Sequence, residues 1–212
     1  MIRWGVIGLG NMATKFCEAI KEVDNAELKG ISSKSKLSLT KFGKSFNIDE
    51  KYQFKNYQEL IDCSDVDAVY ISTLNNTHFD LIKASIQNNK KILCEKPFVL
   101  NLTEANEIKK LIDNKKIFFF EAIAYRSHPQ TKEILKLIQD DVIGSIKKIE
   151  ASFGFKVRKV KKDSRLFNKD FGGGAILDLG CYPISFMQLF DADKNKYEII
   201  DQKNSLAVTG VD

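Results

Sequence analysis

Short apolar runs alternate with amphipathic segments through the first 121 residues, and this alternation constrains the fold more than any other feature. The apolar runs predict strands, and the segments between them carry apolar residues at the spacing of a helix face. The predicted strands lie within residues 2–8, 26–33, 66–73, 90–97 and 117–125. Strands that are apolar throughout and joined by helices belong to a parallel sheet covered on both faces. Residues 1–121 are therefore predicted to form an α/β domain with a doubly wound parallel sheet.

After residue 121 the pattern changes, and residues 122–212 are predicted to form a second domain of the α+β class. One helix is predicted at 128–144, and another follows the glycines at 172–174. Pro183 indicates that this second helix kinks or restarts, because proline has no N–H to donate. Strands are predicted at 145–157, 196–202 and 205–211.

Composition and charge argue against several classes of protein. The chain has 212 residues, and its 33 basic and 28 acidic side chains give a net charge of +5, which does not demand a nucleic-acid partner. The basic segment at 156–162 is the one candidate for nucleic-acid binding, and in a lysine-rich chain it favours a solvated rim. No apolar run approaches the ~20 residues of a membrane span, and the N-terminus lacks the features of a signal peptide. We expect neither a nucleic-acid nor a membrane partner.

The cysteines and histidines are too scattered for a disulfide framework or a metal site. They are Cys17, Cys63, Cys94, Cys181, His78 and His128. Unpaired cysteine spacing of this kind favours a reducing cytoplasm, and two distant histidines make no ligand cluster. We expect a cytoplasmic protein without a bound metal.

A glycine motif follows the first predicted strand and opens the first predicted helix. It is Gly8-Leu9-Gly10-Asn11-Met12-Ala13, a G-x-G-x-x-A sequence. Glycines at these positions allow a tight turn and a close approach of the backbone to a pyrophosphate, which the free N–H groups of the helix N-terminus bind. In the first strand–helix unit of an alternating domain, the motif predicts a dinucleotide site. The alternative is that the glycines only make the turn.

The end of the second predicted strand bears on which dinucleotide binds. An NAD site usually places an acidic residue there, about 20 residues after the glycines, to hold the ribose 2′-hydroxyl. No acid occurs at residues 28–41, where Ser32, Ser33, Lys34 and Lys36 stand instead. Hydroxyls and a cation suit a 2′-phosphate, so NADP is the predicted cofactor, bound by Ser33 and Lys34. A solvated loop is the alternative, above all for Lys36.

Two later strand ends add polar residues at the edge where ligands of open α/β sheets bind. The first is Thr73-Leu74-Asn75-Asn76, followed by His78, whose alternative role is that of a satisfied imidazole at a helix start. The second is Glu95-Lys96-Pro97, where a rigid turn would aim Lys96 at the nicotinamide. An ammonium there could polarise or protonate an oxygen beside the hydride carbon. The alternative is a surface turn with a solvated ion pair.

In order along the chain, these motifs resemble the glucose–fructose oxidoreductase / inositol dehydrogenase / rhizopine-catabolism (Gfo/Idh/MocA) family. The most specific are C-E-K-P-F at 94–98, EAIAYRSHPQ at 121–130 and GGGAILDLGCYP at 172–183. The sequences of the last two motifs resemble those of the sugar and dihydrodiol dehydrogenase branch, which includes NADP-linked xylose dehydrogenases. The resemblance implies a Rossmann domain followed by an open-faced sheet domain, with the substrate held between them.

The resemblance also implies roles for individual residues. The cofactor-binding positions would be Gly8, Gly10, Asn11, Met12, Ala13, Ser33, Lys34, Thr73, Leu74, Asn76, His78, Glu95 and Lys96. Lys96 would contact both nicotinamide and substrate, with Glu95 near the nicotinamide ribose. Asp178 and Tyr182 match the family's D-x-x-x-[HY] pair, in which the tyrosine exchanges the substrate proton. The alternatives are an ion pair buttressing a loop for Asp178 and a core aromatic for Tyr182.

Three further residues would contact substrate, and they are Arg126, His128 and Arg165. Packing and domain-joining bonds are the alternative for the first two. The chain departs from the family where Leu74 replaces a usual proline, and it ends before the later strands of the second sheet. It is therefore expected to be C-terminally truncated relative to the family and to self-associate through its second domain.

The predicted function is that of an NADP-dependent oxidoreductase, with Lys96, Asp178 and Tyr182 as its catalytic residues. It would transfer hydride between the nicotinamide and a CH–OH or C=O carbon of a small carbohydrate or cyclic alcohol. The alternative is a non-catalytic NADP-binding protein or an inactive remnant of such an enzyme.

Overall fold

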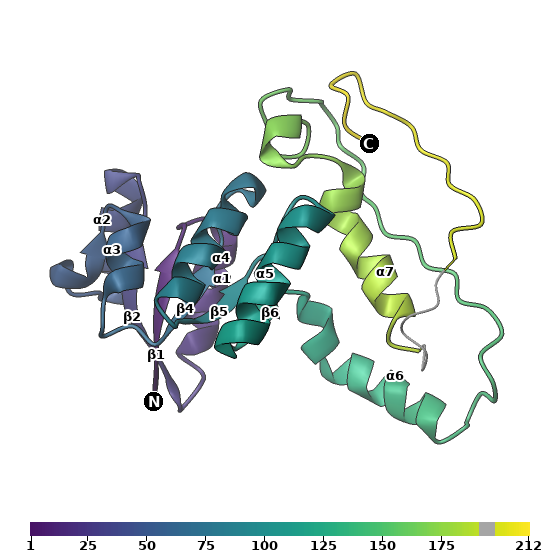
Figure 1. The fold of residues 1–212 in the computed structure, drawn as a ribbon, viewed down its shortest axis with the longest axis horizontal. Helices are drawn as coiled ribbons and strands as arrows, with labels where there is room; N and C mark the ends of the chain where they lie inside the picture. The colour runs from purple at the N-terminus through teal and green to yellow at the C-terminus, as the bar shows by residue number, and fades with distance from the viewer. Residues whose placement is uncertain (191–197) are drawn as a thin grey trace. The chain divides into compact units, whose positions relative to one another are not determined.

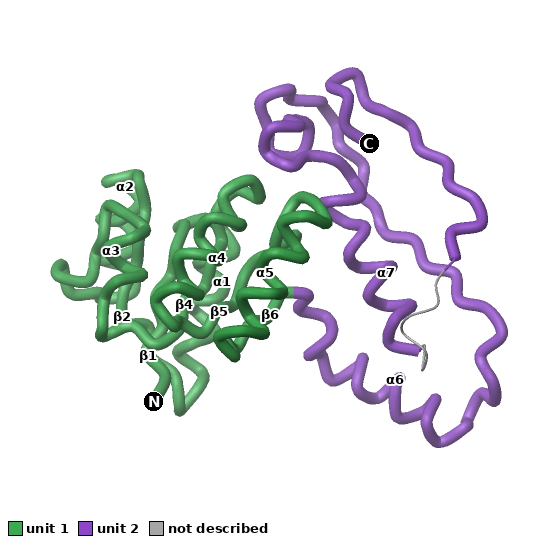
Figure 2. The backbone as a smooth tube through the Cα atoms, viewed as in Figure 1, with its two compact units in different colours: residues 1–122 green, residues 123–212 purple. Residues whose placement is uncertain are grey.

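The computed structural model describes residues 1–190 and 198–212. Within them the chain divides into two compact units, Met1–Ala122 and Ile123–Asp212 (Figure 2). Among the described residues, no helix combines the length and the apolar composition that crossing a bilayer requires. The two units differ in architecture, and each is described by itself.

Unit 1, residues 1–122, is built on a six-stranded parallel sheet with the strand order β3-β2-β1-β4-β5-β6. The strands are β1 (Ile2–Ile7), β2 (Ala26–Ser32), β3 (Gln53–Phe54), β4 (Ala68–Ile71), β5 (Lys91–Cys94) and β6 (Phe119–Glu121). This is the strand order of a Rossmann fold, whose ligands bind beyond the carboxyl ends of the strands. The prediction of a doubly wound parallel sheet is confirmed.

Helices cover both faces of this sheet (Figure 1). They are α1 (Asn11–Ile20), α2 (Lys36–Phe46), α3 (Tyr57–Asp62), α4 (His78–Gln87) and α5 (Leu102–Lys115), with short 3₁₀ turns at Glu50–Tyr52 and Asn75–Thr77. Successive strand residues point to opposite faces, so each face has its own core. Ile7 and Ile71 pack with residues of α3, α4 and α5, whereas Val6 and Tyr70 pack with residues of α1 and α2.

Unit 2, residues 123–212, is helical where the structure gives it regular elements. These are a 3₁₀ turn at Ala124–Ser127, α6 (Pro129–Gln139), a 3₁₀ turn at Lys169–Phe171, the π-helix η5 (Ile176–Gly180) and α7 (Cys181–Met187). The predicted restart near Pro183 is confirmed, because the π-helix gives way to α7 at Gly180–Cys181 and Pro183 falls in the first turn of α7. A proline is tolerated there because the missing N–H lies at the start of the helix.

The strands predicted at 145–157 and 205–211 are wrong, because the described residues of unit 2 contain no strand. The strand predicted at 196–202 lies partly outside the described residues, and residues 198–202 form none. A strand exists only with a hydrogen-bonded neighbour, and these segments pair with no other segment of the described chain. Their apolar side chains show the result, since Phe153 is 58% and Phe155 57% exposed.

Candidate functional site

The glycine turn after β1 is built from backbone contacts that only glycine permits. The Gly8 N–H donates to the Ser32 carbonyl oxygen at 3.0 Å, joining the ends of β1 and β2. Gly8 has φ +88°, and a Cβ there would lie 2.8 Å from the Ser72 carbonyl oxygen at the end of β4. The chain itself therefore requires glycine at this position.

Gly10 differs, because nothing in the chain explains it. Its φ is −95°, which any residue adopts, and a Cβ built on it would meet no atom within 4 Å. Gly10 is the N-cap residue of α1, where no side chain caps the helix and no acid occupies its first turn. The helix N-terminus thus offers uncapped N–H groups and its positive dipole end to the space that a side chain at position 10 would fill. This arrangement fits a pyrophosphate.

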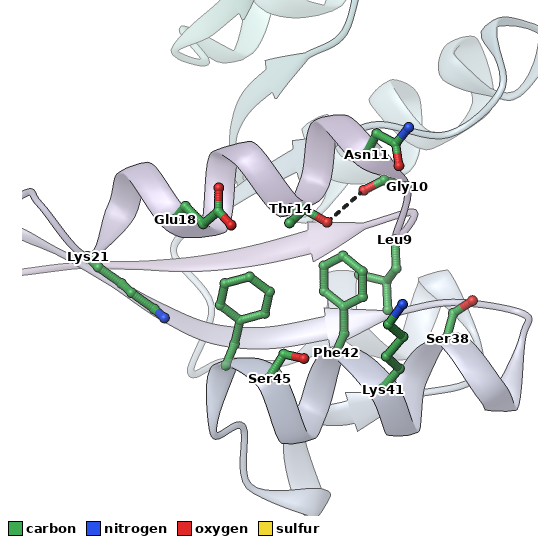
Figure 3. A pocket seen from close by; sticks show the side chains of 11 residues that line it. Leu9, Gly10, Asn11, Thr14, Glu18, Lys21, Ser38, Lys41, Phe42 and Ser45 are labelled. Carbon is green, nitrogen blue, oxygen red and sulfur yellow. Dashed lines mark hydrogen bonds between the residues drawn. The ribbon is translucent and has the colours of Figure 1, made fainter.

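A pocket of about 430 Å³ runs from this helix N-terminus between α1 and α2 (Figure 3). Gly10, Asn11 and Thr14 line it from the side of α1, and the Thr14 hydroxyl donates to the Gly10 carbonyl oxygen at 3.3 Å. Ser38 and Lys41 line it from α2. Hydroxyls and an ammonium beside an uncapped helix favour an anionic group at this end of the pocket.

The end of β2 supplies hydroxyls and cations, as predicted from the acid-free sequence. The Ser33 Oγ accepts the Ser35 N–H at 3.1 Å, which fixes the loop into α2. The Lys34 ammonium stands 5.6 Å from the centre of the Tyr57 ring. Ser32 is fully buried, and its hydroxyl has no hydrogen-bond partner among the described residues. A buried hydroxyl without a partner is costly, so a ligand that reached it would gain from the contact.

The residues after β4 divide into buried and exposed ones. His78 is fully buried, with Nδ1 2.8 Å from the Pro97 carbonyl oxygen and Nε2 3.3 Å from that of Thr73. Burial lowers the pKa of His78. The imidazole therefore ties the end of β4 to the turn after β5, and a positioning role fits it better than contact with a ligand. Leu74 and Asn76 are exposed and available to a ligand.

The turn after β5 begins at a partly buried carboxylate, Glu95. The Tyr70 hydroxyl donates to Glu95 Oε1 at 2.5 Å, and burial together with this carboxylate raises the pKa of Tyr70 well above its usual range. The phenol therefore stays protonated and serves as a donor to Glu95. Lys96 follows directly and is half-buried, and the Lys96–Pro97 peptide bond is cis.

Glu121, at the end of β6, is a residue of this edge that the sequence reasoning missed. Its Oε1 accepts the Phe98 N–H at 3.1 Å, two residues after Lys96. Burial raises the pKa of Glu121, and the charge of Lys96 opposes that rise. The sequence FFFEA at 118–122 could have indicated this role. There an acid ends an apolar strand, and the neighbouring strand end carries a lysine.

In unit 2 the structure brings two predicted residues together. Arg165 Nη1 lies 2.9 Å from Asp178 Oδ1, and Asp178 is buried with 6% exposure. Tyr182 follows on α7, with its ring 5.0 Å from that of Phe153. Asp178 stands in the π-helix, a distortion that frequently occurs at functional sites. The alternatives named for these residues are therefore both present: Asp178 forms an ion pair and Tyr182 packs against an aromatic ring. A catalytic role for either residue would be additional to these contacts.

Arg126 and His128 lie in the same unit and are both exposed. His128 is the N-cap residue of α6, where its Nδ1 accepts the Gln130 N–H at 3.1 Å. Among the described residues of the whole chain, no group of three or more His, Cys, Asp or Glu side chains could hold a metal ion.

A six-stranded Rossmann sheet, whose first strand leads through a glycine turn into an uncapped helix, defines a dinucleotide-binding protein. Residues 2–122, more than half of the chain, match the oxidoreductase family with an NAD-binding Rossmann fold, and residues 131–194 match the GFO/IDH/MocA C-terminal domain. The chain belongs to this GFO/IDH/MocA family, as its motifs predicted.

Among its relatives is the trans-1,2-dihydrobenzene-1,2-diol dehydrogenase of Xenopus tropicalis, which is 31% identical over 99% of this chain and 62% of that protein. The D-xylose 1-dehydrogenase (NADP(+)) of Hypocrea jecorina is 29% identical over 100% of this chain and 60% of that protein. The crystal structure of KijD10, a 3-ketoreductase from Actinomadura kijaniata in complex with NADP and TDP-benzene, superposes with a TM-score of 0.77 at 28% identity, over 89% of this chain and 57% of that one. The chain thus spans about three-fifths of these proteins.

Proposed function

We propose that the protein is an NADP(H)-dependent oxidoreductase that transfers hydride between the nicotinamide and a CH–OH or C=O carbon of a small carbohydrate or cyclic diol. The observation that carries this proposal is Gly10, whose missing side chain leaves open space in front of an uncapped helix. The relatives named as dehydrogenases of a diol and of xylose support the substrate class.

The residues at the carboxyl edge of unit 1 would hold the cofactor. The N–H groups of Asn11, Met12 and Ala13 begin α1 and would bind the pyrophosphate. Ser33 and Lys34 would bind the 2′-phosphate, because no acid at 28–41 would repel it. Thr73, Leu74 and Asn76 follow β4 and would line the cofactor's course, with His78 positioning them. Glu95 and Lys96 would meet the nicotinamide end.

Proton transfer would fall to the remaining predicted residues. The bound nicotinamide accepts or supplies the hydride, and Lys96 and Tyr182 would exchange the alcohol proton or stabilise the oxygen that loses it. Asp178 would position these groups, and its pairing with Arg165 places a cation beside the buried carboxylate. Arg126, His128 and Arg165, all exposed, would contact hydroxyls of the substrate.

The division at Ala122 supports a matching division of labour. We assign residues 1–121 to cofactor binding and residues 122–212 to substrate binding and catalysis. All four cysteines are free thiols, which supports a reducing, cytoplasmic location. The basic segment 156–162 is exposed, and we assign it to solvent rather than to nucleic acid or a membrane.

One observation favours a second function, that of an NADP-binding protein without turnover. Apolar side chains lie exposed along the segments of unit 2 that were predicted as strands, among them Ile199, at 78%, and Val208, at 86%. Exposed apolar surface of this kind favours association between copies. We therefore expect the 212-residue chain to bind NADPH, to turn over slowly if at all, and to self-associate through unit 2.

Cofactor preference gives the sharpest test of the proposed function. Ser33→Asp would add a negative charge while keeping the loop, because an aspartate side chain accepts the same i+2 N–H as Ser33 does. We expect tighter binding of NADPH than NADH by the parent protein and a reversed preference in Ser33→Asp, measured by nicotinamide fluorescence.

The matched control is Ser64→Asp, which adds the same charge just before β4, at the opposite edge of the sheet. It should leave the preference unchanged. Equal affinities in the parent protein, or tighter NADH, would contradict NADP as the cofactor. Turnover is then assayed with NADP(H) against aldoses, inositols and dihydrodiols, and binding without any turnover would select the second function.

A further inference from the structure

The carboxylate of Glu121 is a partly buried acid at the carboxyl edge of the sheet to which no role has been assigned. Glu121 ends β6, and in the sheet register it lies beside Cys94 at the end of β5. It is half-buried, and its Oε1 accepts the Phe98 N–H at 3.1 Å. The hydrogen bond therefore spans the turn that contains Lys96 and fastens that turn to the next strand.

The charged and titratable groups around Glu121 come from three neighbouring elements. Lys96 and Glu95, at the end of β5, both act electrostatically on Glu121, in opposite directions. Glu95 in turn accepts the hydrogen bond from Tyr70 on β4 and acts on His78 at the start of α4. The thiol of Cys94 is fully buried beside both carboxylates, which with burial raise its pKa. Lys96 is thus the cation within a cluster of two carboxylates.

We propose that Glu121 is a positioning residue for Lys96: its carboxylate fixes the turn through the Phe98 N–H and supplies a negative charge that balances the ammonium. The inference rests on the proposed function in that it assigns Lys96 to the reaction. Loss of the charge would leave the turn in place and change how Lys96 exchanges its proton. Loss of the hydrogen bond alone would loosen the turn and leave the charge.

The same turn offers a matched control. Glu104 is also a carboxylate that accepts a backbone N–H from this segment, since its Oε2 lies 3.1 Å from the Leu100 nitrogen. It stands on the first turn of α5, where its backbone N–H is also held by Asn101. Glu104→Gln thus makes the same chemical change at a comparable hydrogen bond, four residues beyond Lys96.

The first experiment compares Glu121→Gln with Glu104→Gln in the full 212-residue chain, with thermal unfolding to confirm that both fold. Glutamine keeps an oxygen that accepts the N–H and removes only the charge. Glu121→Gln should lower kcat by about tenfold or more, part of the roughly 10²–10⁴-fold that acid–base catalysis contributes. It should also shift the pH profile of kcat and leave the KM for NADPH within about twofold of the parent value. Glu121→Asp, which keeps the charge, should recover part of the rate.

Two outcomes of this experiment would overturn the proposal. One is an unchanged rate and pH profile in Glu121→Gln. The other is an equal loss of kcat in Glu104→Gln, which would show that Glu121 acts only as one of two hydrogen-bond acceptors that hold the turn. Glu104→Gln is expected to retain the rate and the pH profile of the parent chain.

The second experiment needs neither turnover nor cofactor. Titration of the Glu121 side-chain carboxyl by ¹³C NMR, in the parent chain and in Lys96→Met, measures the coupling of the two charges directly. The pKa of Glu121 should lie above its usual range in the parent and rise further in Lys96→Met, because burial then acts without the opposing ammonium. An equal pKa in both proteins would overturn the charge balance. A shifted pKa in a chain that binds NADPH but shows no turnover with any substrate would select the second function, an NADP-binding protein without turnover, and leave the coupling of the two charges intact.

Discussion

The two units of the chain bury apolar side chains to very different extents. Among the described residues, every buried apolar side chain except Val211 belongs to unit 1. Unit 1 pairs each strand with a parallel neighbour and covers both faces with helices, so the N–H and C=O groups along its inner strands are paired within the sheet. Unit 2 has helices and turns but no paired strands in its described residues. The comparison teaches that apolar alternation makes a sheet only where a neighbouring strand is present.

Hydrogen exchange should show the largest difference between the units. Amides of β1, β4 and β5 should exchange on the order of 10³-fold or more slowly than those of 145–157 and 205–208, since an opening free energy of about 5 kcal/mol corresponds to such a factor. Mass spectrometry of the exchanging chain measures both sets at once. Comparable protection of the two sets would show that unit 2 pairs its strands in solution, for instance between copies of the chain.

Dilution shows whether any strand pairing in unit 2 occurs within one chain or between copies of the chain. If copies of the chain pair, protection of 145–157 and 205–208 should fall with protein concentration while that of unit 1 stays constant. Light scattering on the same samples reports the association. A monodisperse monomer would contradict self-association through unit 2.

Within unit 1, the two glycines of the cofactor turn offer a pair of identical substitutions with different expected results. Gly8→Ala should lower the free energy of unfolding by about 2 kcal/mol or more, because alanine is strained at φ +88° and its Cβ would lie 2.8 Å from the Ser72 carbonyl oxygen. Gly10→Ala should change it by at most about 1 kcal/mol, since its Cβ would meet no atom within 4 Å.

The effect on NADPH affinity should not follow the effect on stability. Gly10→Ala, although folded, should bind NADPH at least about tenfold more weakly, because its methyl group would occupy the space assigned to the pyrophosphate. Chemical denaturation and nicotinamide fluorescence on both variants measure the two effects. Unchanged NADPH affinity in Gly10→Ala would show that the space in front of α1 is not the phosphate site.

Local sequence predicted most of unit 1 because each of its elements is specified by nearby residues. The strands β1, β2, β4 and β5 are short segments of four to seven mainly apolar residues, and the glycine turn has its own spacing. Asn101 opens α5 by accepting the Glu104 N–H at 3.0 Å, a capping role that asparagine favours. The polar residues at the strand ends follow from the parallel topology.

The features that the sequence did not predict depend on contacts between distant segments. Glu121 acquires a role because β6 lies beside β5, which joins its carboxylate to Phe98, 23 residues earlier. For His78 the sequence left two roles open, contact with the cofactor and a satisfied imidazole at a helix start. Its approaches to the carbonyl oxygens of Pro97 and Thr73 depend on the turn after β5 lying beside the end of β4. The prediction of strands in unit 2 was wrong for the same reason. A strand needs a second segment to pair with, and the sequence of residues 145–157 does not show whether such a segment is present.

The ion pair of Arg165 with Asp178 should carry a moderate share of the stability of unit 2. Arg165→Met would leave a carboxylate of 8% side-chain exposure without its cation, and should destabilise the region around α7 by about 1–3 kcal/mol. Arg158→Met, at an exposed arginine of the same unit, is the control and should have little effect. Limited proteolysis near α7 reads the difference, and equal cleavage rates in the two variants would show that Asp178 is held by other contacts.

The smallest expected effect lies at the opposite edge of unit 1, where Arg3 joins β1 to the residues before β4. Its Nη2 donates to Asp67 Oδ1 at 2.7 Å and its Nε to Oδ2 at 3.0 Å, and this guanidinium holds the pKa of Asp67 well below its usual range. A carboxyl whose pKa is lower in the folded than in the unfolded protein stabilises the fold above its unfolded value, about 3.9, and loses that contribution as the pH falls.

Asp67→Asn should therefore lower the unfolding midpoint of unit 1 at pH 7, by a margin that shrinks as the pH falls below about 4. Asp113→Asn, which removes an exposed pair with Lys109, should change the midpoint little, because side chains exposed by 60% and 74% gain little from pairing. Thermal unfolding of the three proteins across this pH range makes the comparison. Glu121 should act in the opposite sense, because burial raises its pKa and its protonation at low pH favours the folded state. A margin for Asp67→Asn that grows on acidification would contradict the ion pair as its source.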